Sequence, residues 1–400
     1  MISVEEARTR ILAGLTPTGP EIVPLAAAWG RVLAGPVAAR LTQPPHDVSA
    51  MDGYALRAAD GGLGAVLRVV GSAPAGHPWS GRLAPGEALR LFTGSVMPDG
   101  ADAVLLQEDA TADGGRVIVN EAVVLRRHIR SAGQDFAQGD VLLAPGRRLN
   151  ARDIGLIAAA NHPWVAVHRR PVVAILATGD EIALPGEPIP PGGIVSSNSH
   201  ALAALVTAAG GEPLVLPVAP DDRAAIAAAA AAVRADLLVT AGGASVGEHD
   251  LVQAALRDAG MVLDFWKIAM RPGKPLMAGR LASLPMIGLP GNPVSSMITA
   301  VLFVWPAIAR LAGLPGAAPP VLPARLGAAL PANDRRADHL RARLSTDAAG
   351  ALVATAFGRQ DSGMLRLLVE ADALILRPPE APALPQGSDV PIIRLDAIGV

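Results

Sequence analysis

Short apolar runs alternate with helical patterns between residues 170 and 315. The runs that have the length of buried strands are 171–177, 213–218, 236–240 and 285–289. Helical patterns occupy 198–209, 221–234 and 251–258, and a long apolar helix follows the last strand. Asp221 stands at the start of the second helix, where a carboxylate can cap the helix. This alternation predicts a doubly wound α/β domain with a mainly parallel sheet.

The remaining segments have different patterns. Residues 1–37 look helical. Residues 65–145 alternate short Val/Leu strands with Gly, Pro and Asp turns, which predicts a separate β-rich region. After a Pro- and Ala-rich linker at 314–320, residues 318–400 read as short strands with turns and predict a small β-barrel or sandwich. A chain of 400 residues is too long for one ordinary core, so several domains are expected.

Polar or glycine-rich segments follow the predicted strands of the α/β domain. They are Thr178-Gly-Asp-Glu181, Pro220-Asp-Asp222, the loop 241–247 and Pro290-Gly-Asn-Pro293. Open α/β sheets bind ligands at the carboxyl ends of their strands. One such segment would be an ordinary loop, but four at the same edge predict a binding site. Glu181, Asp221 and Asp250 could supply the oxygen ligands that Mg²⁺ needs, although each acid alone could be a helix cap.

The loop Ala241-Gly-Gly-Ala-Ser-Val-Gly247 leads into the helix at 251–258. Its backbone N–H groups would face a phosphate, and the helix N-terminus would add a favourable field. The loop matches neither the Walker sequence nor the dinucleotide fingerprint, which weakens the NTPase and dehydrogenase interpretations. The segment from Pro290 to Ser296 also precedes a helix and could hold an oxyanion.

The chain has only two lysines, Lys267 and Lys274, and both lie in Trp266-Lys-Ile-Ala-Met-Arg-Pro-Gly-Lys-Pro275. An ammonium is a compact point charge that the planar guanidinium of arginine does not replace at a tight site. A chain that otherwise uses arginine therefore has reason to keep lysine where it binds an anion. The alternative is that both lysines are accidental surface charges.

Two further polar turns lie in the N-terminal half. Asp52 stands in a Gly turn beside the only tyrosine of the chain and could hold a cation or a ribose hydroxyl, although Asp-Gly turns are usually only turns. Thr93 begins a Gly/Ser turn that could bind an anion. The densest basic group, residues 126–130, reads as a solvated face or a local anion site.

Composition narrows the possible classes. The absence of cysteine excludes disulfides, thiolate metal sites and a cysteine nucleophile. A net charge of −2 without a broad basic face gives no sign of nucleic-acid binding. The N-terminus lacks the pattern of a signal peptide, and the longest apolar run, 297–311, is shorter than the roughly 20 residues of a membrane span. We therefore expect a soluble, cytoplasmic protein that binds no membrane.

Five motifs occur in a characteristic order. They are Ser49-Ala-Met-Asp-Gly-Tyr-Ala55, Thr178-Gly-Asp-Glu181, Gly242-Gly-Ala-Ser-Val-Gly247, Arg271-Pro-Gly-Lys-Pro275 and Leu289-Pro-Gly-Asn-Pro-Val-Ser295. Together they resemble the MoeA-type molybdopterin molybdotransferases, or molybdenum insertases, which are related to the E domain of gephyrin. The resemblance spans nearly the whole chain.

The resemblance implies a four-part, elongated homodimer. Its parts are a helical/extended linker domain (1–37 and 136–169), a β-rich domain (38–135), an α/β molybdopterin-binding domain (170–316) and a C-terminal β-barrel (317–400). It implies a transferase that takes adenylylated molybdopterin and molybdate, uses Mg²⁺, and releases AMP. It also implies the molybdopterin adenylyltransferase and recipient molybdoenzymes as candidate partners.

Site residues follow from the resemblance motif by motif. The expected catalytic residues are Asp52, Thr93, Glu181, Asp221, Asp250, Lys267, Arg271 and Lys274, of which Glu181, Asp221 and Asp250 are the expected metal ligands. The expected substrate-binding residues are Arg130, Asp135, Gly242, Gly243, Ser245, Pro275, Pro290, Pro293, Ser295, Arg341 and Ser362. Asp52 and Thr93 would come from one subunit and face the α/β domain of the other.

Two other functions remain open. An ATP-dependent molybdopterin adenylyltransferase would use the same kind of α/β domain, but the large flanking β regions favour the insertase. A non-catalytic, pterin-binding scaffold is the second alternative. The many acids and the two retained lysines favour an enzyme.

Overall fold

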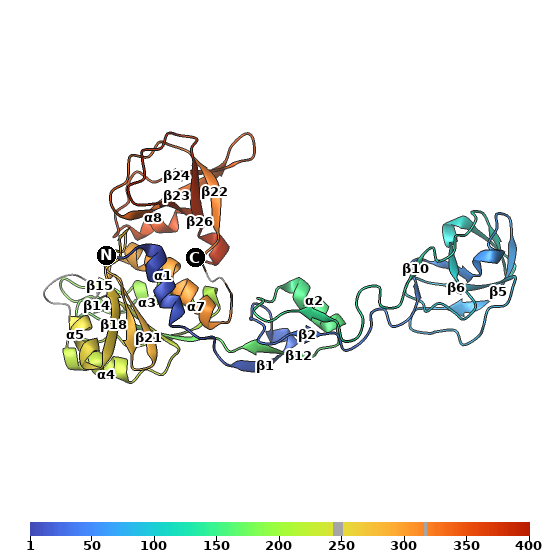
Figure 1. Ribbon diagram of the computed structural model, residues 1–400, viewed down its shortest axis with the longest axis horizontal. Helices are drawn as coiled ribbons and strands as arrows, with labels where there is room; N and C mark the ends of the chain where they lie inside the picture. The colour runs from blue at the N-terminus through green and yellow to red at the C-terminus, as the bar shows by residue number, and fades with distance from the viewer. Residues whose placement is uncertain (243–250, 316–317) are drawn as a thin grey trace.

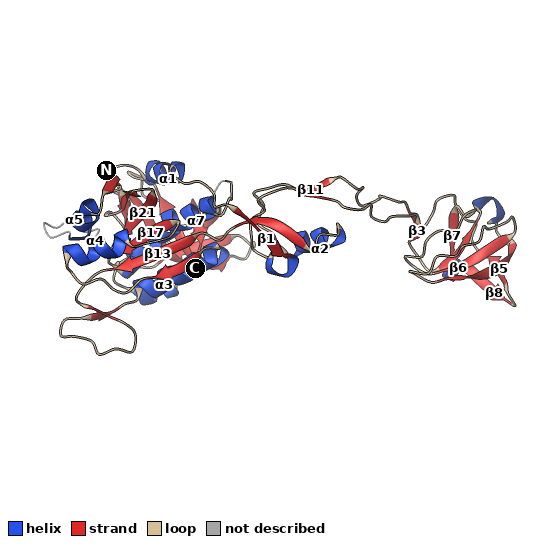
Figure 2. Ribbon diagram, turned by 90° about the horizontal axis from the view of Figure 1, so that it is seen from below, coloured by secondary structure: helices blue, strands red, loops and turns tan. Residues whose placement is uncertain are grey.

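The structure is a computed structural model that describes residues 1–242, 251–315 and 318–400. The molecule is elongated, with an α/β domain and a barrel at one end, a small linker domain in the middle and a β-rich domain at the other end (Figure 1). A view turned by 90° shows the same order of parts (Figure 2). The chain reaches the β-rich domain and returns along a second connection, and a β-bridge joins Gln43 to Phe136 between the two.

A six-stranded sheet forms the centre of the α/β domain. Its strand order is β16 (Glu212–Val215), β13 (Val172–Ala177), β17 (Leu237–Ala241), β21 (Leu284–Leu289), β20 (Met277–Leu281) and β18 (Met261–Trp266). The first four strands are parallel, whereas β20 pairs antiparallel with both β21 and β18. The prediction of a mainly parallel sheet is confirmed.

Helices cover both faces of this sheet. One face carries α1 (Val4–Ala13), α3 (Asn198–Ala209) and the helical segment made of α6 (Pro293–Thr299), the π-helix η4 (Ala300–Val304) and α7 (Trp305–Leu311). The other face carries α4 (Arg223–Ala231) and α5 (Leu251–Asp258). In β13, Val173 and Ile175 point to the first face and Ala174 and Leu176 to the second, which a strand buried on both sides requires. The doubly wound fold is therefore confirmed; α3 has the bounds predicted from the sequence, and α5 ends at the predicted residue, Asp258.

The helical segment Pro293–Leu311 is long and apolar enough to cross a membrane by length and composition. Of its most apolar window, however, 89% is buried inside the protein. Phe303, Ile308 and their neighbours belong to the largest hydrophobic cluster of the domain. The segment is therefore the central core helix of this fold.

The N-terminal helix is much shorter than the sequence predicted. The Ser3 hydroxyl accepts a hydrogen bond from the Glu6 N–H at 3.0 Å and caps α1, which ends before Gly14. The prediction of helix up to residue 37 is wrong, because prolines at 17, 20 and 24 remove the N–H groups that a helix needs. Val4, Ala7 and Ile11 pack in the core of the α/β domain, and the chain then enters the linker domain as strand β1 (Pro20–Pro24).

The linker domain is built from two short antiparallel pairs and one helix. The pairs are β1 with β12 (Trp164–His168) and β2 (Val37–Ala38) with β11 (Val141–Leu143). Helix α2 (Ala151–Ala159) begins with a capping box, in which Asn150 and Asp153 bond each other's backbone N–H groups. The helix and strands share a small core that includes Leu33, Ile157 and Val167.

The β-rich domain holds a second six-stranded sheet. Its order is β7 (Ala103–Leu106), β4 (Gly53–Leu56), β6 (Glu87–Leu91), β5 (Val66–Ala73), β9 (Arg116–Val119) and β8 (Ala110–Asp113). A separate ladder of β3 (Val48–Ser49) and β10 (Ile129–Arg130) lies where the chain enters and leaves. Short 3₁₀ helices lie at Leu25–Ala27, Ala58–Asp60, Gln107–Asp109 and Asp396–Ile398.

The C-terminal domain is a closed barrel, which confirms the barrel prediction. Its strands are β22 (Val321–Leu326), β23 (Ala337–Thr346), β24 (Leu352–Ala356), β25 (Ala373–Arg377) and β26 (Asp389–Arg394). The pairing of β23 with both β24 and β25 closes the circle. Strand β19 (Met270–Arg271) leaves the α/β domain and pairs with β23, which joins the two domains.

Candidate functional site

A cleft of about 880 Å³ opens at the carboxyl ends of β13, β17 and β21. Six residues predicted from the sequence line it: Glu181, Asp221, Gly242, Pro275, Pro290 and Pro293. The barrel contributes Leu365, the first residue of α8 (Leu365–Val369). The topology thus brings loops that are far apart in sequence to the edge where α/β sheets bind their ligands.

Glu181 lies directly over the turn after β13. Gly179 has a φ of +140°, and a Cβ at this position would come within 2.4 Å of a Glu181 carboxylate oxygen. Glycine therefore permits the fold-back of Glu181 toward its own turn. The Glu181 carbonyl accepts a hydrogen bond from the Ile194 N–H at 2.8 Å, beside the short pair β14 (Ile182–Ala183) and β15 (Ile194–Val195). No side chain in the described residues bonds the Glu181 carboxylate, which remains available to a ligand.

The three neighbouring aspartates have different tasks. Asp180 accepts a hydrogen bond from the Asp221 N–H at 3.0 Å, and Asp222 caps α4 by accepting from the Ala225 N–H at 2.8 Å. These two carboxylates thus bind backbone N–H groups and stabilise the fold. Asp221 lines the cleft, and its carboxylate has no such partner within the described chain. Asp221 and Glu181 are therefore the acids available for chemistry.

The described residues contain no group of three His, Asp or Glu side chains arranged to hold a metal ion. The predicted third ligand, Asp250, and the predicted anion-binding residues Gly243 and Ser245 lie outside the described residues. Mg²⁺ commonly uses only one or two protein carboxylates and takes its other ligands from water and substrate phosphate. Glu181 and Asp221, which both line the cleft, could supply these two carboxylates.

The loop from Lys267 to Leu276 folds back on itself. The Ile268 N–H donates to the Lys274 carbonyl at 3.0 Å, and the Lys267 N–H donates to the Leu276 carbonyl at 3.3 Å. Lys267 sits 4.2 Å from the Trp266 ring centroid, a cation–π contact. Lys274 is exposed, directly precedes the cleft-lining Pro275, and has no acidic partner within the described chain. Its charge is therefore free to bind an anion.

Arg271 points to the barrel instead of the cleft lining. Its Nε donates to Asp338 Oδ1 at 2.8 Å, and its Nη1 lies 3.4 Å from Asp334 Oδ2. The hydrogen bond with Asp338 raises the pKa of Arg271. In this conformation two carboxylates pair with the guanidinium, which joins β19 to the barrel, and the catalytic role expected for Arg271 stays a prediction.

Arg341 is likewise a structural residue here. It is 1% exposed, and its side chain donates to Gln360 and to the carbonyls of Met364 and Asp361. Arg341 does not line the cleft, and the substrate-binding role expected for it stays a prediction. It fixes the segment 360–364, and this segment carries Ser362.

Ser362 reaches the cleft wall. Its hydroxyl accepts a hydrogen bond from Asn292 Nδ2 at 3.0 Å, and its carbonyl accepts from the Val294 N–H at 3.1 Å. Ser295 is in the first turn of α6 and is 4% exposed. The barrel therefore shapes the Pro290–Pro293 loop through Ser362, with Arg341 behind it.

Four predicted residues lie in or near the β-rich domain, at the other end of the molecule (Figure 1). Thr93 donates to Asp52 Oδ1 twice, from its N–H at 2.7 Å and from its hydroxyl at 2.9 Å. These hydrogen bonds, led by the backbone one, hold the pKa of Asp52 below its ordinary value. Arg130 is exposed in register with Val48, and the Asp135 N–H donates to the Gln43 carbonyl at 3.1 Å. They do not reach the α/β cleft of the same chain.

Sequence reasoning missed a polar group in the cleft wall. Ser196, Ser197 and Asn198 line the cleft at the start of α3, and so does Asn292. Asn198 Nδ2 donates to the Gly291 carbonyl at 2.8 Å, which ties α3 to the loop after β21. The sequence contains a signal for this group, because Ser196, Ser197 and Asn198 are small polar residues at the start of a predicted helix. Polar residues before a helix also indicated the other loops of the predicted site.

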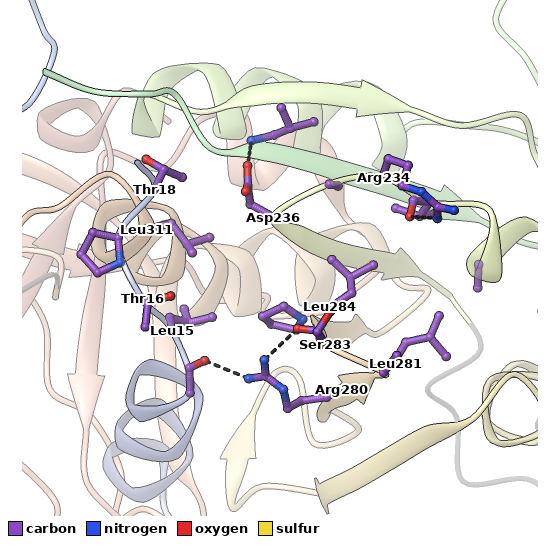
Figure 3. A pocket seen from close by; sticks show the side chains of 18 of the residues that line it. Leu15, Thr16, Thr18, Arg234, Asp236, Arg280, Leu281, Ser283, Leu284 and Leu311 are labelled. Carbon is purple, nitrogen blue, oxygen red and sulfur yellow. Dashed lines mark hydrogen bonds between the residues drawn. The ribbon is translucent and has the colours of Figure 1, made fainter. Parts of the chain in front are cut away.

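A second hollow, of about 920 Å³, lies at the opposite edge of the sheet (Figure 3). Its charged side chains already form ion pairs or hydrogen bonds with other groups of the protein. Arg169 pairs with Asp236. Arg280 donates to the carbonyls of Gly14 and Ser283 (Figure 3). Helices of a doubly wound fold end at this edge, and the negative ends of their dipoles disfavour anions. We therefore assign substrate binding to the cleft of about 880 Å³ at the carboxyl ends of the strands.

Comparison with known families agrees with this arrangement. Residues 2–161 match the MoeA N-terminal region (domain I and II), 174–310 match a probable molybdopterin binding domain, and 323–395 match the MoeA C-terminal region (domain IV). The molybdopterin molybdenumtransferase of Nostoc sp. is 37% identical over 386 residues, covering 94% of this chain and 88% of the relative. Molybdopterin molybdenumtransferase 2 of Mycobacterium tuberculosis is 35% identical and covers 98% of this chain and 99% of its own length.

The fold also matches a solved structure. The molybdopterin biosynthesis MoeA protein of Pyrococcus horikoshii superposes with a TM-score of 0.86, at 28% identity, over 98% of this chain and 100% of that one. Sequence and structure agree along the whole chain, from the helix α1 to the barrel. The chain therefore belongs to the MoeA family of molybdopterin molybdenumtransferases.

Proposed function

We propose that this protein inserts molybdenum from molybdate into adenylylated molybdopterin and releases AMP, the last step in making the molybdenum cofactor. The observation that carries the proposal is the cleft at the carboxyl edge of the α/β sheet, with acids on one wall and the loop of Lys274 and Pro275 beside it. The named activity of relatives that are 35–37% identical over most of the chain supports the same reaction.

The residues of the cleft suit an anionic substrate with a phosphate bridge. Molybdate is a dianion, and the exposed ammonium of Lys274 offers a compact charge to hold it. The backbone at the start of the helix that begins at Pro293 offers N–H groups and a favourable helix field for a second anionic group. Arg271 keeps its barrel partners in this arrangement, so Lys274 carries the larger part of molybdate binding.

Glu181 and Asp221 would hold Mg²⁺ in this proposal, with Asp250 as the third expected ligand. The metal would offset phosphate charge and polarise the phosphorus–oxygen bond that breaks when AMP leaves. The polar wall of Ser196, Ser197 and Asn198 would orient the substrate by hydrogen bonds. Catalysis would then consist mainly of positioning and electrostatic stabilisation.

Asp52 and Thr93 would serve the cleft of a second copy of the chain. They belong to the β-rich domain, which lies at the far end of the elongated molecule from the α/β domain (Figure 1), so within one chain they have no access to the cleft. A homodimer in which the β-rich domain of one subunit meets the α/β domain of the other gives them a role. We also propose that the protein works in the cytoplasm, with the adenylyltransferase that makes its substrate and the molybdoenzymes that take its product as partners.

AMP release by the purified protein tests the function. Adenylylated molybdopterin and Mg²⁺ are supplied with and without molybdate to the wild type, to Lys274→Ala and to a control, Arg325→Ala, which removes an exposed cation from barrel strand β22. We expect molybdate-dependent AMP release that falls at least about tenfold in Lys274→Ala, because the main anion ligand is lost, and stays unchanged in the control.

The same assay separates the alternatives. Consumption of ATP with molybdopterin in the absence of molybdate would indicate an adenylyltransferase instead. Tight pterin binding without AMP release would indicate a scaffold. Equal losses of AMP release in Lys274→Ala and Arg325→Ala would show that the loop containing Lys274 does not bind molybdate.

A further inference from the structure

The Asp52–Thr93 pair is assembled from two strands of the β-rich sheet. Asp52 directly precedes β4, and Thr93 follows β6 by two residues. In this antiparallel pair Gly53 is opposite Leu91 and Tyr54 is opposite Arg90. Both hydrogen bonds from Thr93 go to Oδ1 of Asp52, and no described residue bonds Oδ2. The direction in which Oδ2 points therefore depends on how β4 is held against β6.

The side chain of Arg90 holds the two strands together at this point. Its Nη1 donates to the Gly53 carbonyl at 3.1 Å, and its Nη2 donates to Gln107 Oε1 at 2.7 Å. The Gln107 N–H in turn donates to the Asp52 carbonyl at 3.1 Å. The guanidinium thus bonds the Gly53 carbonyl directly and is linked to the Asp52 carbonyl through Gln107.

Two aromatic rings fix the guanidinium itself. Its central carbon lies 5.1 Å from the Tyr54 ring centroid and 5.0 Å from the Phe92 ring centroid. Stacking of this kind restricts the arginine rotamer and is worth about 0.5–1 kcal/mol per contact at an exposed site. No carboxylate of the described chain forms an ion pair with Arg90, so its charge acts on the nearby Asp52. After the two bonds from Thr93, this charge also lowers the pKa of Asp52.

We propose that Arg90 is a positioning residue for the molybdenum-transfer reaction, which fixes the Asp52 carboxylate so that Oδ2 stays available to substrate. The inference rests on the proposed function, in which Asp52 enters the cleft of a second copy. Arginine suits this task because its planar fork bonds Gly53 and Gln107 at once, whereas lysine carries the charge without the fork.

If Arg90 had a purely structural role, the expected results would be different. An arginine that only joins β4 to β6 would change the stability of the β-rich domain when replaced, and nothing else. A positioning residue also changes the carboxylate that it holds. The pKa of Asp52 and the turnover number are therefore readouts that a structural role does not move.

The experiment compares the full-length wild type with Arg90→Met, Arg90→Lys and a control, Arg116→Met, which removes an exposed arginine from β9 of the same sheet. The pKa of Asp52 is measured without substrate by NMR of protein labelled at the aspartate carboxyl carbons, with Asp52→Asn assigning the signal. Molybdate-dependent AMP release gives kcat and KM, and thermal unfolding gives Tm.

In Arg90→Met we expect the pKa of Asp52 to rise and kcat to fall roughly tenfold, with KM changed by less than about twofold. Arg90→Lys keeps the low pKa but only part of kcat, and Arg116→Met behaves as wild type. A fall in Tm with an unchanged Asp52 pKa and unchanged kcat overturns the proposal. If the wild type releases no AMP, the proposed function fails, and the titration still decides whether Arg90 acts on Asp52.

Discussion

His339 is a buried base at the joint between the α/β domain and the barrel. It is 5% exposed on β23, next to Asp338, and no described residue bonds its Nδ1. Burial lowers the pKa of His339 to about 4 from its ordinary value of 6.5. The folded protein therefore holds a neutral imidazole that the unfolded chain would protonate at mildly acidic pH.

This difference predicts that acid destabilises the protein. The unfolded state binds more protons than the folded state between pH 6.5 and about 4, so the free energy of unfolding falls as the pH is lowered through this range. At pH 5 the loss from this residue is about 2 kcal/mol. Urea unfolding at pH 7.5 and pH 5 measures it. His339→Gln should remove most of the dependence, and the exposed His200→Gln should not; an equal effect of both would contradict the prediction.

At the scale of elements, the turn between β19 and β20 decides where Lys274 stands. Gly273 is buried with a φ of +107°, and a Cβ there would lie 2.4 Å from Thr299 Cγ2 on α6. The loop can thus lie flat against the helix only if this residue has no side chain. The sequence motif Pro-Gly-Lys-Pro is explained by this contact, because the glycine lets the loop carry its lysine to the cleft rim.

Gly273→Ala should therefore both destabilise the protein and lower activity. We expect a loss of about 2–4 kcal/mol from the strained backbone and the clash together, and a fall in molybdate-dependent AMP release. Gly260→Ala is the matched control, because Gly260 has a φ of +91° with nothing within 4 Å of its Cβ position. It should cost only about 1–2 kcal/mol and leave activity unchanged. Equal Tm values for the two variants would show that contact with α6 is unimportant.

At the scale of the whole molecule, the distance between the β-rich domain and the α/β domain of one chain leads to a test of the homodimer. Asp52→Asn and Lys274→Ala are each expected to be strongly impaired alone. If Asp52 serves the cleft of its partner, a mixed dimer of these two variants has one intact site, which contains the wild-type residue of each chain. If both residues serve the same chain, every site of the mixed dimer is defective.

Co-expression of the two variants with different affinity tags, followed by purification through both tags, isolates the mixed dimer. We expect about half the wild-type rate of AMP release from it, since one of two sites is intact. The double variant Asp52→Asn/Lys274→Ala paired with itself is the control and should be inactive. An inactive mixed dimer of normal stability would contradict the shared site.

Local signals in the sequence were reliable where the cause is local. Helix α3 was predicted at its observed bounds and α5 at its observed end, because periodicity and flanking residues act over a few positions. The N-terminal helix was predicted too long because apolar and acidic spacing was given more weight than the prolines after Gly14. The contacts of Arg271 and Arg341 could not be predicted from motifs, since their partners, Asp338 and Asp361, are 67 and 20 residues away.

The sequence by itself determined the α/β domain, the acids and glycine loops at the ends of its strands, the two lysines and the order of motifs, because these depend on residue type and short spacing. Only the tertiary structure decided which of those residues meet. In the structure Glu181 and Asp221 line one cleft, whereas the carboxylates of Asp180 and Asp222 accept hydrogen bonds from backbone N–H groups. Asp52 belongs to the β-rich domain, at the far end of the molecule. The physical reason is that a side chain binds substrate only if the fold leaves its polar atoms unpaired and facing a cavity, and that depends on contacts between distant parts of the chain.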